Sequence, residues 1–263
     1  MVSAQLEQLL VAPGTPARLA ERDPRDTLGL AKEEAKQQTK KLCDRIDELQ
    51  YLLYAEARHA VLLLLQGLDA SGKDGVIRRV FSGVNPQGVR VTPFKAPAGA
   101  ELEHDYLWRI HAALPPRGTI GVFNRSHYED VVTVGVLGLF PEDVWRRRAR
   151  HIREFERILA DEGTTTVKVF LNVSREKQRE RLQERIDEPR KRWKLGPGDL
   201  EVNERYDEYL SAYEAAITGT ATEWAPWHVV PADRNWVKAY ATASILCETL
   251  ERLDPRLPSG ATA

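Results

Sequence analysis

The stretch Leu62-Leu63-Leu64-Leu65-Gln66-Gly67-Leu68-Asp69-Ala70-Ser71-Gly72-Lys73-Asp74-Gly75 decides the fold. A short apolar run ends in a glycine-rich turn, which is followed by a lysine and a helical pattern. This layout is typical of a phosphate-binding loop, in which backbone N–H groups and the start of a helix face an anion. The pattern G-x-x-x-x-G-K is matched completely from Gly67 to Lys73. We therefore expect contacts with phosphate from Gly67, Ala70, Ser71, Gly72, Lys73 and Asp74.

Two acids distinguish this loop from the common pattern. Asp74 stands where a Ser or Thr hydroxyl normally binds magnesium, and Asp69 occupies the third position of the loop. The sequence therefore predicts a phosphate cradle with extra carboxylates. A chance glycine-rich turn is the alternative, but the apolar strand before the loop and the helix after it favour a functional site.

Length and composition limit the class of protein. The chain has 263 residues, 42% of them hydrophobic, which is enough for one α/β domain with a large core. Its 38 basic and 39 acidic residues give a net charge of −1, which argues against a nucleic-acid-binding or membrane-surface protein. No apolar run has the length of a membrane span or of the core of a signal peptide. Cys43 and Cys247 lack metal-ligand spacing, so we expect packed thiols in a reduced, cytoplasmic compartment.

The hydrophobic pattern predicts strands that alternate with helices. Residues 1–34 are expected to be a loose, partly flexible arm, 35–253 the folded domain, and 254–263 a tail. Strands are predicted at 60–66, 89–92, 119–123, 165–172 and 227–230. Helices are predicted at 33–57, after the loop to 81, and at 101–113, 141–161, 175–186, 199–218 and 235–253. The alternation predicts a three-layer α/β fold, with helices on both faces of a parallel sheet.

Ligands of such sheets bind at the C-terminal ends of the strands. The first strand ends in the loop, and the third runs into Asn124-Arg125-Ser126-His127-Tyr128-Glu129-Asp130. Asp69, Glu129 and Asp74 are candidate oxygen ligands of magnesium. Arg125 is a candidate clamp for a phosphate. A solvated turn is the alternative for Glu129 and Asp130.

A second cationic segment runs from Arg175 to Lys194. Many of its cations have glutamates three or four residues away, which is typical of a solvated helix. The cluster from Arg185 to Lys194 has few acids nearby and is interrupted by Pro189. We favour a mobile basic lid, at about residues 175–198, that closes over phosphates. A solvated helix face remains the alternative.

Several motifs, in this order, resemble the polyphosphate kinase 2 family from about residue 35 to residue 253. They are Gly67-Leu-Asp-Ala-Ser-Gly-Lys-Asp-Gly75, Asn85-Pro-Gln-Gly-Val-Arg90, Phe94-Lys-Ala-Pro97, His104-Asp-Tyr-Leu-Trp-Arg109, Phe123-Asn-Arg-Ser-His-Tyr-Glu-Asp-Val131 and Ala225-Pro-Trp with Val230-Pro-Ala-Asp233. The resemblance implies a P-loop kinase core with a helical lid, which uses magnesium to transfer phosphoryl groups from inorganic polyphosphate to nucleotides. It also implies a homodimer or homotetramer. The motif from Asn124 to Asp130 is similar to the class III branch, whose members phosphorylate AMP and ADP.

The resemblance also implies roles for single residues. Asp69 and Lys73 match the family's loop acid and lysine, and Asn124, Arg125 and Glu129 match its second motif. The basic lid pattern is matched by Arg181, Arg185, Lys191 and Lys194, with Glu188-Pro189 where Asp-Pro is usual. Lys95 and Asp105 match positions on the nucleotide side, where Asn124 and Arg125 are also expected. The implied metal ligands are Asp69, Asn124 and Glu129, for Mg²⁺ or alternatively Mn²⁺, which leaves Asp74 free to cap the helix.

We therefore expect a polyphosphate-dependent nucleotide kinase. Its catalytic groups are expected to be Asp69, Lys73, Arg125, Glu129 and Arg185. One alternative is an ATP-dependent kinase of nucleoside monophosphates resembling thymidylate kinase, although such enzymes have Ser or Thr at the position of Asp74. Another is a regulatory module that senses nucleotides or polyphosphate without turnover.

Overall fold

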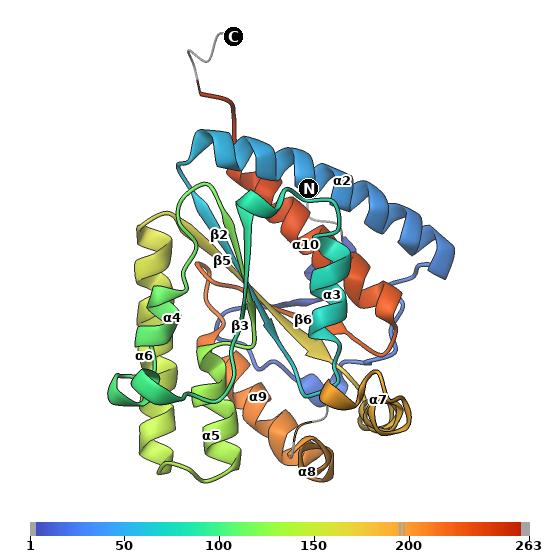
Figure 1. The fold of residues 1–263 in the computed structure, drawn as a ribbon, viewed down its shortest axis with the longest axis vertical. Helices are drawn as coiled ribbons and strands as arrows, with labels where there is room; N and C mark the ends of the chain where they lie inside the picture. The colour runs from blue at the N-terminus through green and yellow to red at the C-terminus, as the bar shows by residue number, and fades with distance from the viewer. Residues whose placement is uncertain (1–3, 195, 197, 259–263) are drawn as a thin grey trace.

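A six-stranded sheet forms the centre of the molecule, in a computed structural model that describes residues 4–194, 196 and 198–258. The strands lie in the order β1-β6-β5-β2-β4-β3 (Figure 1). Five of them run parallel to their neighbours, as predicted, whereas β1 pairs antiparallel with β6. Their bounds are β1 Leu10–Val11, β2 Ala60–Gln66, β3 Val89–Pro93, β4 Ile120–Asn124, β5 Thr164–Asn172 and β6 Trp227–Pro231.

Helices cover both faces of this sheet, which confirms the layered α/β arrangement. In Figure 1, α2, α3 and α10 lie on one side, and α4, α5, α6 and α9 lie on the other. The α-helices are α1 Ala4–Glu7, α2 Lys32–Glu56, α3 Lys73–Val80, α4 Trp108–Ala112, α5 Val132–Val136, α6 Glu142–Asp161, α7 Arg175–Asp187, α8 Asp199–Glu204, α9 Tyr206–Thr220 and α10 Asn235–Leu253. In the described part of the chain, 3₁₀ segments lie at η1 Leu19–Glu21, η2 Pro86–Gly88, η3 Gly99–Glu103, η4 His127–Asp130 and η5 Arg192–Lys194.

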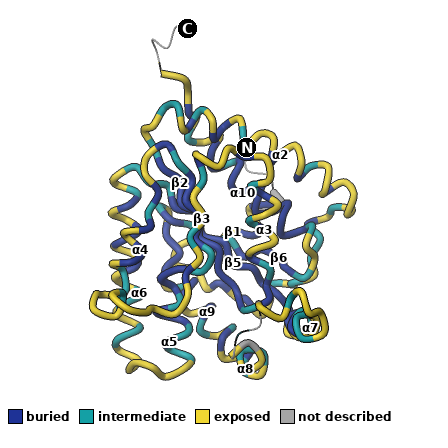
Figure 2. Tube along the Cα trace, viewed as in Figure 1, coloured by how far each residue is buried: buried dark blue, intermediate teal, exposed yellow. Residues whose placement is uncertain are grey.

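Strand β2 lies in the middle of the core. All seven of its residues are buried, because both of its faces are covered and both of its edges are paired, to β4 and β5. Figure 2 shows this burial along the central strands. The apolar run that precedes the loop is therefore a central strand.

The two cysteines, Cys43 and Cys247, are buried free thiols, as predicted. None of the described helices has both the length and the apolar character needed to cross a membrane.

The N-terminal segment is not the loose arm that its prolines suggested. Leu6, Leu9 and Leu19 are each at most 3% exposed, and β1 adds a strand to the edge of the sheet. The Val229 N–H donates to the Leu9 carbonyl at 2.8 Å. Scattered leucines therefore anchor a segment that has little regular structure of its own.

Two predicted helices are interrupted. Within residues 101–113, only Trp108–Ala112 is α-helical, because the Asp105 carboxylate accepts from the Leu107 N–H at 2.9 Å and forms a separate turn. Within residues 199–218, the chain breaks at Arg205 into α8 and α9. The Arg205 guanidinium donates to the Val136 carbonyl in α5, a short helix that the sequence pattern did not predict.

A buried ion pair lies between β5 and α6. Lys168 and Glu156 are each 0% exposed, and Lys168 Nζ lies 2.6 Å from Glu156 Oε2. The same ammonium donates to the Tyr128 hydroxyl at 3.0 Å and to the Thr220 carbonyl at 2.8 Å. The Tyr128 hydroxyl in turn donates to Glu156 Oε1 at 2.8 Å. Because Tyr128 belongs to η4, this network supports the segment that carries Glu129.

We predict that Glu156→Gln lowers the free energy of unfolding by about 3–5 kcal/mol, because it leaves the Lys168 charge buried without a counter-charge. The double variant Glu156→Gln with Lys168→Met should recover a large part of that loss. Urea denaturation measures both effects. A single variant within about 1 kcal/mol of the wild type would contradict the assignment of an energetically coupled pair.

Candidate active site

Three segments meet at the C-terminal edge of the sheet, as the strand pattern predicted. The loop Gly67–Lys73 follows β2, the segment from Arg125 to Asp130 follows β4, and α7 follows β5. The Arg125 N–H donates to the Leu65 carbonyl at 3.1 Å, which joins the second segment to the first. The Gln178 side chain of α7 donates to the Asp69 carbonyl at 3.1 Å.

Four residues at this edge have backbone with positive φ. Ala70 and Arg125 have φ angles of 61° and 62°, which are uncommon for residues with a Cβ. Gly67 and Gly72 have φ angles of 143° and 101°. Both φ angles favour glycine. A Cβ on Gly67 would also meet the Leu171 carbonyl, and one on Gly72 would displace the end of the Lys238 side chain. Strained backbone of this kind is concentrated at functional sites.

Asp69 and Arg125 contact each other directly across the site. The Arg125 guanidinium donates to Asp69 Oδ1, and both side chains are partly buried. Burial opposes ionisation of Asp69, but the charges of Arg125 and Lys73 outweigh it, so the pKa of Asp69 lies below its ordinary value. Burial opposes the Arg125 charge as well, but Asp69 and Glu129 raise the pKa of Arg125. Both groups are therefore charged in the absence of substrate.

Lys73 is 8% exposed and faces the carbonyls of its own loop. Its ammonium donates to the Gly67 carbonyl at 2.6 Å and to the Leu68 carbonyl at 3.3 Å. Burial, assisted by the Arg125 charge, lowers the pKa of Lys73 to about 8. The lysine is thus held at the loop before any phosphate is present.

Asn124 contacts Asp74 and no other described side chain through its amide nitrogen. Its Nδ2 donates to Asp74 Oδ1 at 2.8 Å, which ties the end of β4 to the first turn of α3. The N-cap position of α3 is Gly72, without a side-chain hydrogen bond at the cap. Asp74 lies in the first turn of α3, where its charge favours the helix dipole.

Glu129 is contacted by two hydroxyl groups, and the sequence analysis singled out neither of them. Thr133 Oγ1 donates to Glu129 Oε2 at 2.6 Å, and the Tyr213 hydroxyl lies 3.4 Å from Glu129 Oε1. Thr133 follows Glu129 by one helical turn, so this spacing was visible in the sequence. Tyr213 comes from α9, and no local signal links it to Glu129.

The lid cations fall into different environments. Arg181 donates to the Ala70 and Ser71 carbonyls at 3.1 Å, and to the Ala232 and Asp233 carbonyls at 2.9 and 2.8 Å. It therefore braces the loop against the turn that follows β6. The charge of Arg185 contributes to lowering the pKa of Asp69.

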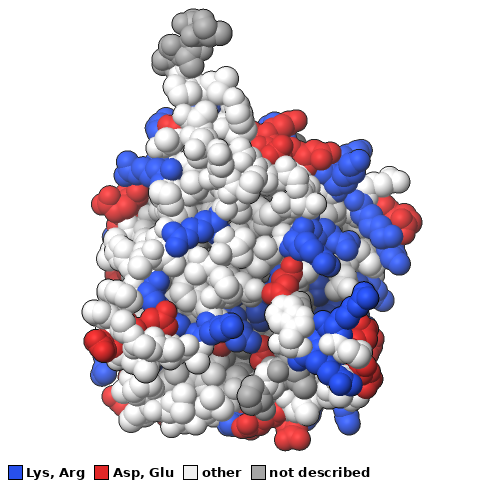
Figure 3. Space-filling model, viewed as in Figure 1, with Lys and Arg blue, Asp and Glu red and all other residues white. Residues whose placement is uncertain are grey.

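Two further lid lysines differ from Arg181 and Arg185. Lys191 pairs with Glu184 at 3.2 Å and with Glu188 at 2.9 Å, contrary to the expectation that few acids lie near this cluster. The side chain of Lys194 lies outside the described residues. Figure 3 shows Lys and Arg gathered over α3 and α7, with Asp and Glu beside them.

The two residues expected on the nucleotide side lie near β3 and before α4. Phe94, at the end of β3, donates its N–H to the Asn124 carbonyl at 3.0 Å, which brings the neighbouring Lys95 to the same edge of the sheet. The Lys95 carbonyl accepts from the buried Arg109 at 2.7 Å. Asp105 is exposed and forms the turn before α4.

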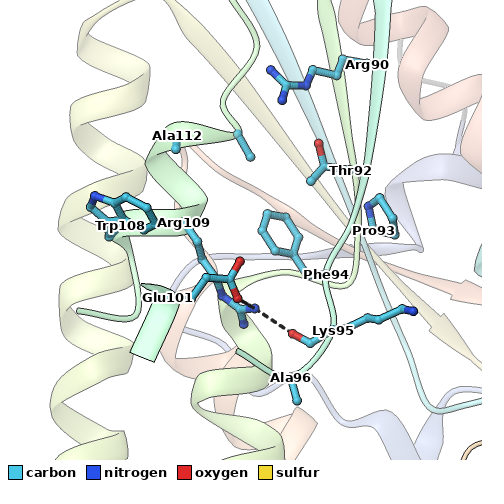
Figure 4. Close-up of a pocket in the computed structure, with 11 residues that line it drawn as sticks. Arg90, Thr92, Pro93, Phe94, Lys95, Ala96, Glu101, Trp108, Arg109 and Ala112 are labelled. Atoms are coloured by element: carbon cyan, nitrogen blue, oxygen red, sulfur yellow. Dashed lines mark hydrogen bonds and ion pairs between the residues drawn. The ribbon is translucent and has the colours of Figure 1, made fainter. Parts of the chain in front are cut away.

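A cavity of about 370 Å³ lies between β3 and α4, lined among others by Arg90, Thr92, Phe94, Trp108 and Arg109. In Figure 4, the Lys95 side chain points away from this cavity, and the Phe94 ring faces α4. The residues that line the cavity include Lys95 but none of the phosphate loop.

The acids at this edge suit a magnesium ion that is shared with phosphate. Among the described residues, no group of three or more His, Cys, Asp or Glu side chains could hold a metal by itself. Mg²⁺ binds one or two carboxylates and completes its shell with water and substrate phosphates. Asp69 and Glu129 act on the same two cations, Lys73 and Arg125, and so lie around one site. The residues fit a substrate-bridged ion, and not an all-protein cage.

Comparison with known proteins assigns the chain to a family. A family model described as polyphosphate kinase 2 matches residues 29–258. The chain belongs to the polyphosphate kinase 2 family. An AMP/ADP-polyphosphate phosphotransferase of Meiothermus ruber is 52% identical over 260 residues, which are 98% of this chain and 97% of that protein. An ADP-polyphosphate phosphotransferase of Rhodopseudomonas palustris is 46% identical over 227 residues, 82% of this chain and 78% of that protein.

A solved structure agrees with this membership of the polyphosphate kinase 2 family. The crystal structure of polyphosphate kinase 2 from Arthrobacter aurescens TC1 has a TM-score of 0.94 and 40% identity. The match covers 100% of this chain and 94% of that one. The resemblance carried by the sequence motifs is thus confirmed. The match of the whole chain also includes the packed N-terminal segment.

Proposed function

We propose that this protein transfers phosphoryl groups from inorganic polyphosphate to AMP and ADP, giving ADP and ATP, in a reversible and magnesium-dependent reaction. The observation that carries the proposal is the relative named for AMP and ADP, which is 52% identical over nearly the whole chain. The geometry supports it, because a phosphate loop, an arginine and a cationic helix meet at one edge of the sheet. Asp74 bonds Asn124 where an ATP-dependent kinase would have a metal-binding hydroxyl.

The residues of the site suggest how the transfer proceeds. A phosphate oxygen of the nucleotide attacks the terminal phosphorus of polyphosphate in line, so no covalent enzyme intermediate is needed. Lys73, Arg125 and Arg185 neutralise charge on the transferred group. Asp69 and Glu129, with Asn124 beside them, hold Mg²⁺ or Mn²⁺, which supplies charge neutralisation and orientation of the phosphates.

Substrate binding must change two contacts of the free protein. Arg125 contacts Asp69, and Lys73 contacts the Gly67 carbonyl. Asp69 would hold Mg²⁺ with the same carboxylate that Arg125 contacts. We propose that Arg125 leaves Asp69 and turns to the phosphates when the substrate binds, which forms the phosphate clamp.

Other features of the proposal rest on family membership and on the placement of single residues. We propose that the fold is a P-loop kinase core closed by a lid that contains α7. We also propose that the protein assembles as a homodimer or homotetramer in the cytoplasm. Lys95 and Asp105, with Asn124 and Arg125, are proposed to contact the nucleotide. Arg181, Lys191 and Lys194 are proposed to contact polyphosphate, Arg181 in addition to its bonds with the loop.

A time course with polyphosphate, magnesium and AMP tests the function. We expect ADP to appear first and ATP to follow, because both acceptors use the same site. ADP without ATP would contradict the use of ADP as an acceptor, and no product would contradict the proposal as a whole. If a nucleoside triphosphate replaced polyphosphate as the better donor, the ATP-dependent alternative would be correct. Tight binding without turnover would favour a sensing module.

A further inference from the structure

A buried lysine of α10 lies behind the phosphate loop, and the predicted site did not include it. Lys238 is 2% exposed, and its ammonium donates to the Ser71 carbonyl at 2.6 Å. A second, longer contact of 3.4 Å joins it to the Ala232 carbonyl. Gly72 leaves the space that the ammonium occupies, because any Cβ at residue 72 would collide with Nζ. The loop and the lysine are therefore built to fit each other.

The contact with Ser71 orients one peptide unit of the loop. In a trans peptide, the carbonyl and the following N–H point in opposite directions. Holding the Ser71 carbonyl from behind therefore directs the Gly72 N–H to the other side of the loop, where a phosphate is expected. Among the described residues, no partner is recorded for that N–H.

The charge of Lys238 has no counter-charge of its own. No described carboxylate lies within ion-pair distance of its ammonium. The charged groups that face it are Lys73 from α3, Arg181 and Lys177 from α7, and Asp233 from the turn before α10. Asp233 accepts hydrogen bonds from the Ser174 N–H and hydroxyl, both at 2.8 Å. Burial, together with the Arg181 charge, lowers the pKa of Lys238 to about 6.

We propose that Lys238 is a positioning residue that holds the Ser71–Gly72 peptide toward the phosphate, and that anion binding in the loop brings a proton onto its amine. Burial favours the neutral amine in the free protein, and a phosphate on the far side of one peptide favours the charged form. Protonation then strengthens the bond to the Ser71 carbonyl. The inference rests on the loop Gly67–Lys73 binding a phosphate of the substrate.

Calorimetry of polyphosphate binding tests the proton directly. Titrations without nucleotide at pH 7, in two buffers with different enthalpies of ionisation, give the number of protons taken up. We expect the wild type to take up roughly 0.5–0.9 proton per site more than Lys238→Met. The difference between the two proteins cancels the ionisation of polyphosphate itself. Equal uptake would overturn the proposal, whereas absence of binding to the wild type would overturn the phosphate site instead.

Kinetics separate this role from a purely structural one. Lys238→Met should raise the KM for polyphosphate by about 10-fold to 100-fold, the effect expected for a hydrogen bond to a charged group. The wild-type KM should rise between pH 6 and pH 8, as the amine becomes harder to protonate. Lys238→Arg, which stays charged, should show a smaller rise, because only Lys73 then loses its proton in that range. A lower melting temperature with an unchanged pH profile would show that Lys238 only stabilises the fold.

The matched control is Thr242→Val, one turn further along α10. Thr242 is 0% exposed, and its hydroxyl has no hydrogen-bond partner among the residues that the structure describes, so the change removes a buried polar group without removing a hydrogen bond to the loop. We expect its proton uptake and KM to equal those of the wild type. If Lys238→Met does not fold, the wild type is compared with Lys238→Arg instead. Identical dependence of the KM on pH in these two proteins would exclude the uptake of a proton by Lys238.

Discussion

Replacing Lys73 by methionine is expected to lower kcat/KM for polyphosphate and AMP by a factor on the order of 10³ or more. The ammonium is 8% exposed and is held by the Gly67 and Leu68 carbonyls, so it is already oriented when the phosphate arrives. Methionine keeps most of the apolar part of the side chain, and removes the charge together with the hydrogen bonds of the ammonium. Steady-state rates of ADP formation measure the effect.

The control for this variant is Lys36→Met on α2. Lys36 pairs with Glu33 at 2.8 Å on the exposed face of that helix, so its loss should leave the rate within about threefold. Circular dichroism should show native helix content for both variants. A Lys73→Met protein that is folded and retains more than about a tenth of the activity would exclude the lysine from the chemistry.

Arg125→Ala is expected to lower kcat by a factor on the order of 10³, with a smaller change in KM, because the guanidinium is proposed to act on charge that develops in the transition state. The backbone at residue 125 has a φ of 62°. Alanine is subject to the same strain as arginine there, so the effect can be attributed to the guanidinium. Rapid-quench measurement of a single turnover separates the chemical step from product release.

Arg146→Ala provides the comparison. Arg146 is exposed on α6 and donates to Glu142 at 2.7 Å, as many solvated arginines do. We expect near-wild-type kinetics from it. If Arg125→Ala changed only KM, the arginine would bind the ground state and the transition state equally, and the clamp would have to be assigned to another cation such as Arg185.

Much of the fold was predictable because its signals are local. The run from Ala60 to Leu65 is apolar at every position, and α10 was predicted with its observed bounds, Asn235–Leu253. The predictions failed where distant contacts overrode local patterns. Leucines of the N-terminal segment pack on the domain, and Arg205 divides a predicted helix by reaching α5.

The candidate site shows the same division. Gly67, Asp69, Lys73, Arg125 and Glu129 were identified by motif, and the structure brings their segments to one edge. Arg181 was recognised as a basic lid residue, but its guanidinium is occupied by four carbonyls. No sequence pattern distinguishes an arginine that bonds backbone carbonyls from one that is available to bind phosphate, because the carbonyls come from two other segments.

By itself, the sequence determined the phosphate loop, the central strand before it and the family, because each depends on residues that are neighbours in the chain. Only the tertiary structure decided which charges are buried and what they contact. Lys238 and Ser71 are 167 positions apart, yet their contact orients the loop. The protonation state of a buried amine depends on the exclusion of solvent and on charges from several helices, and these exist only once the chain has folded.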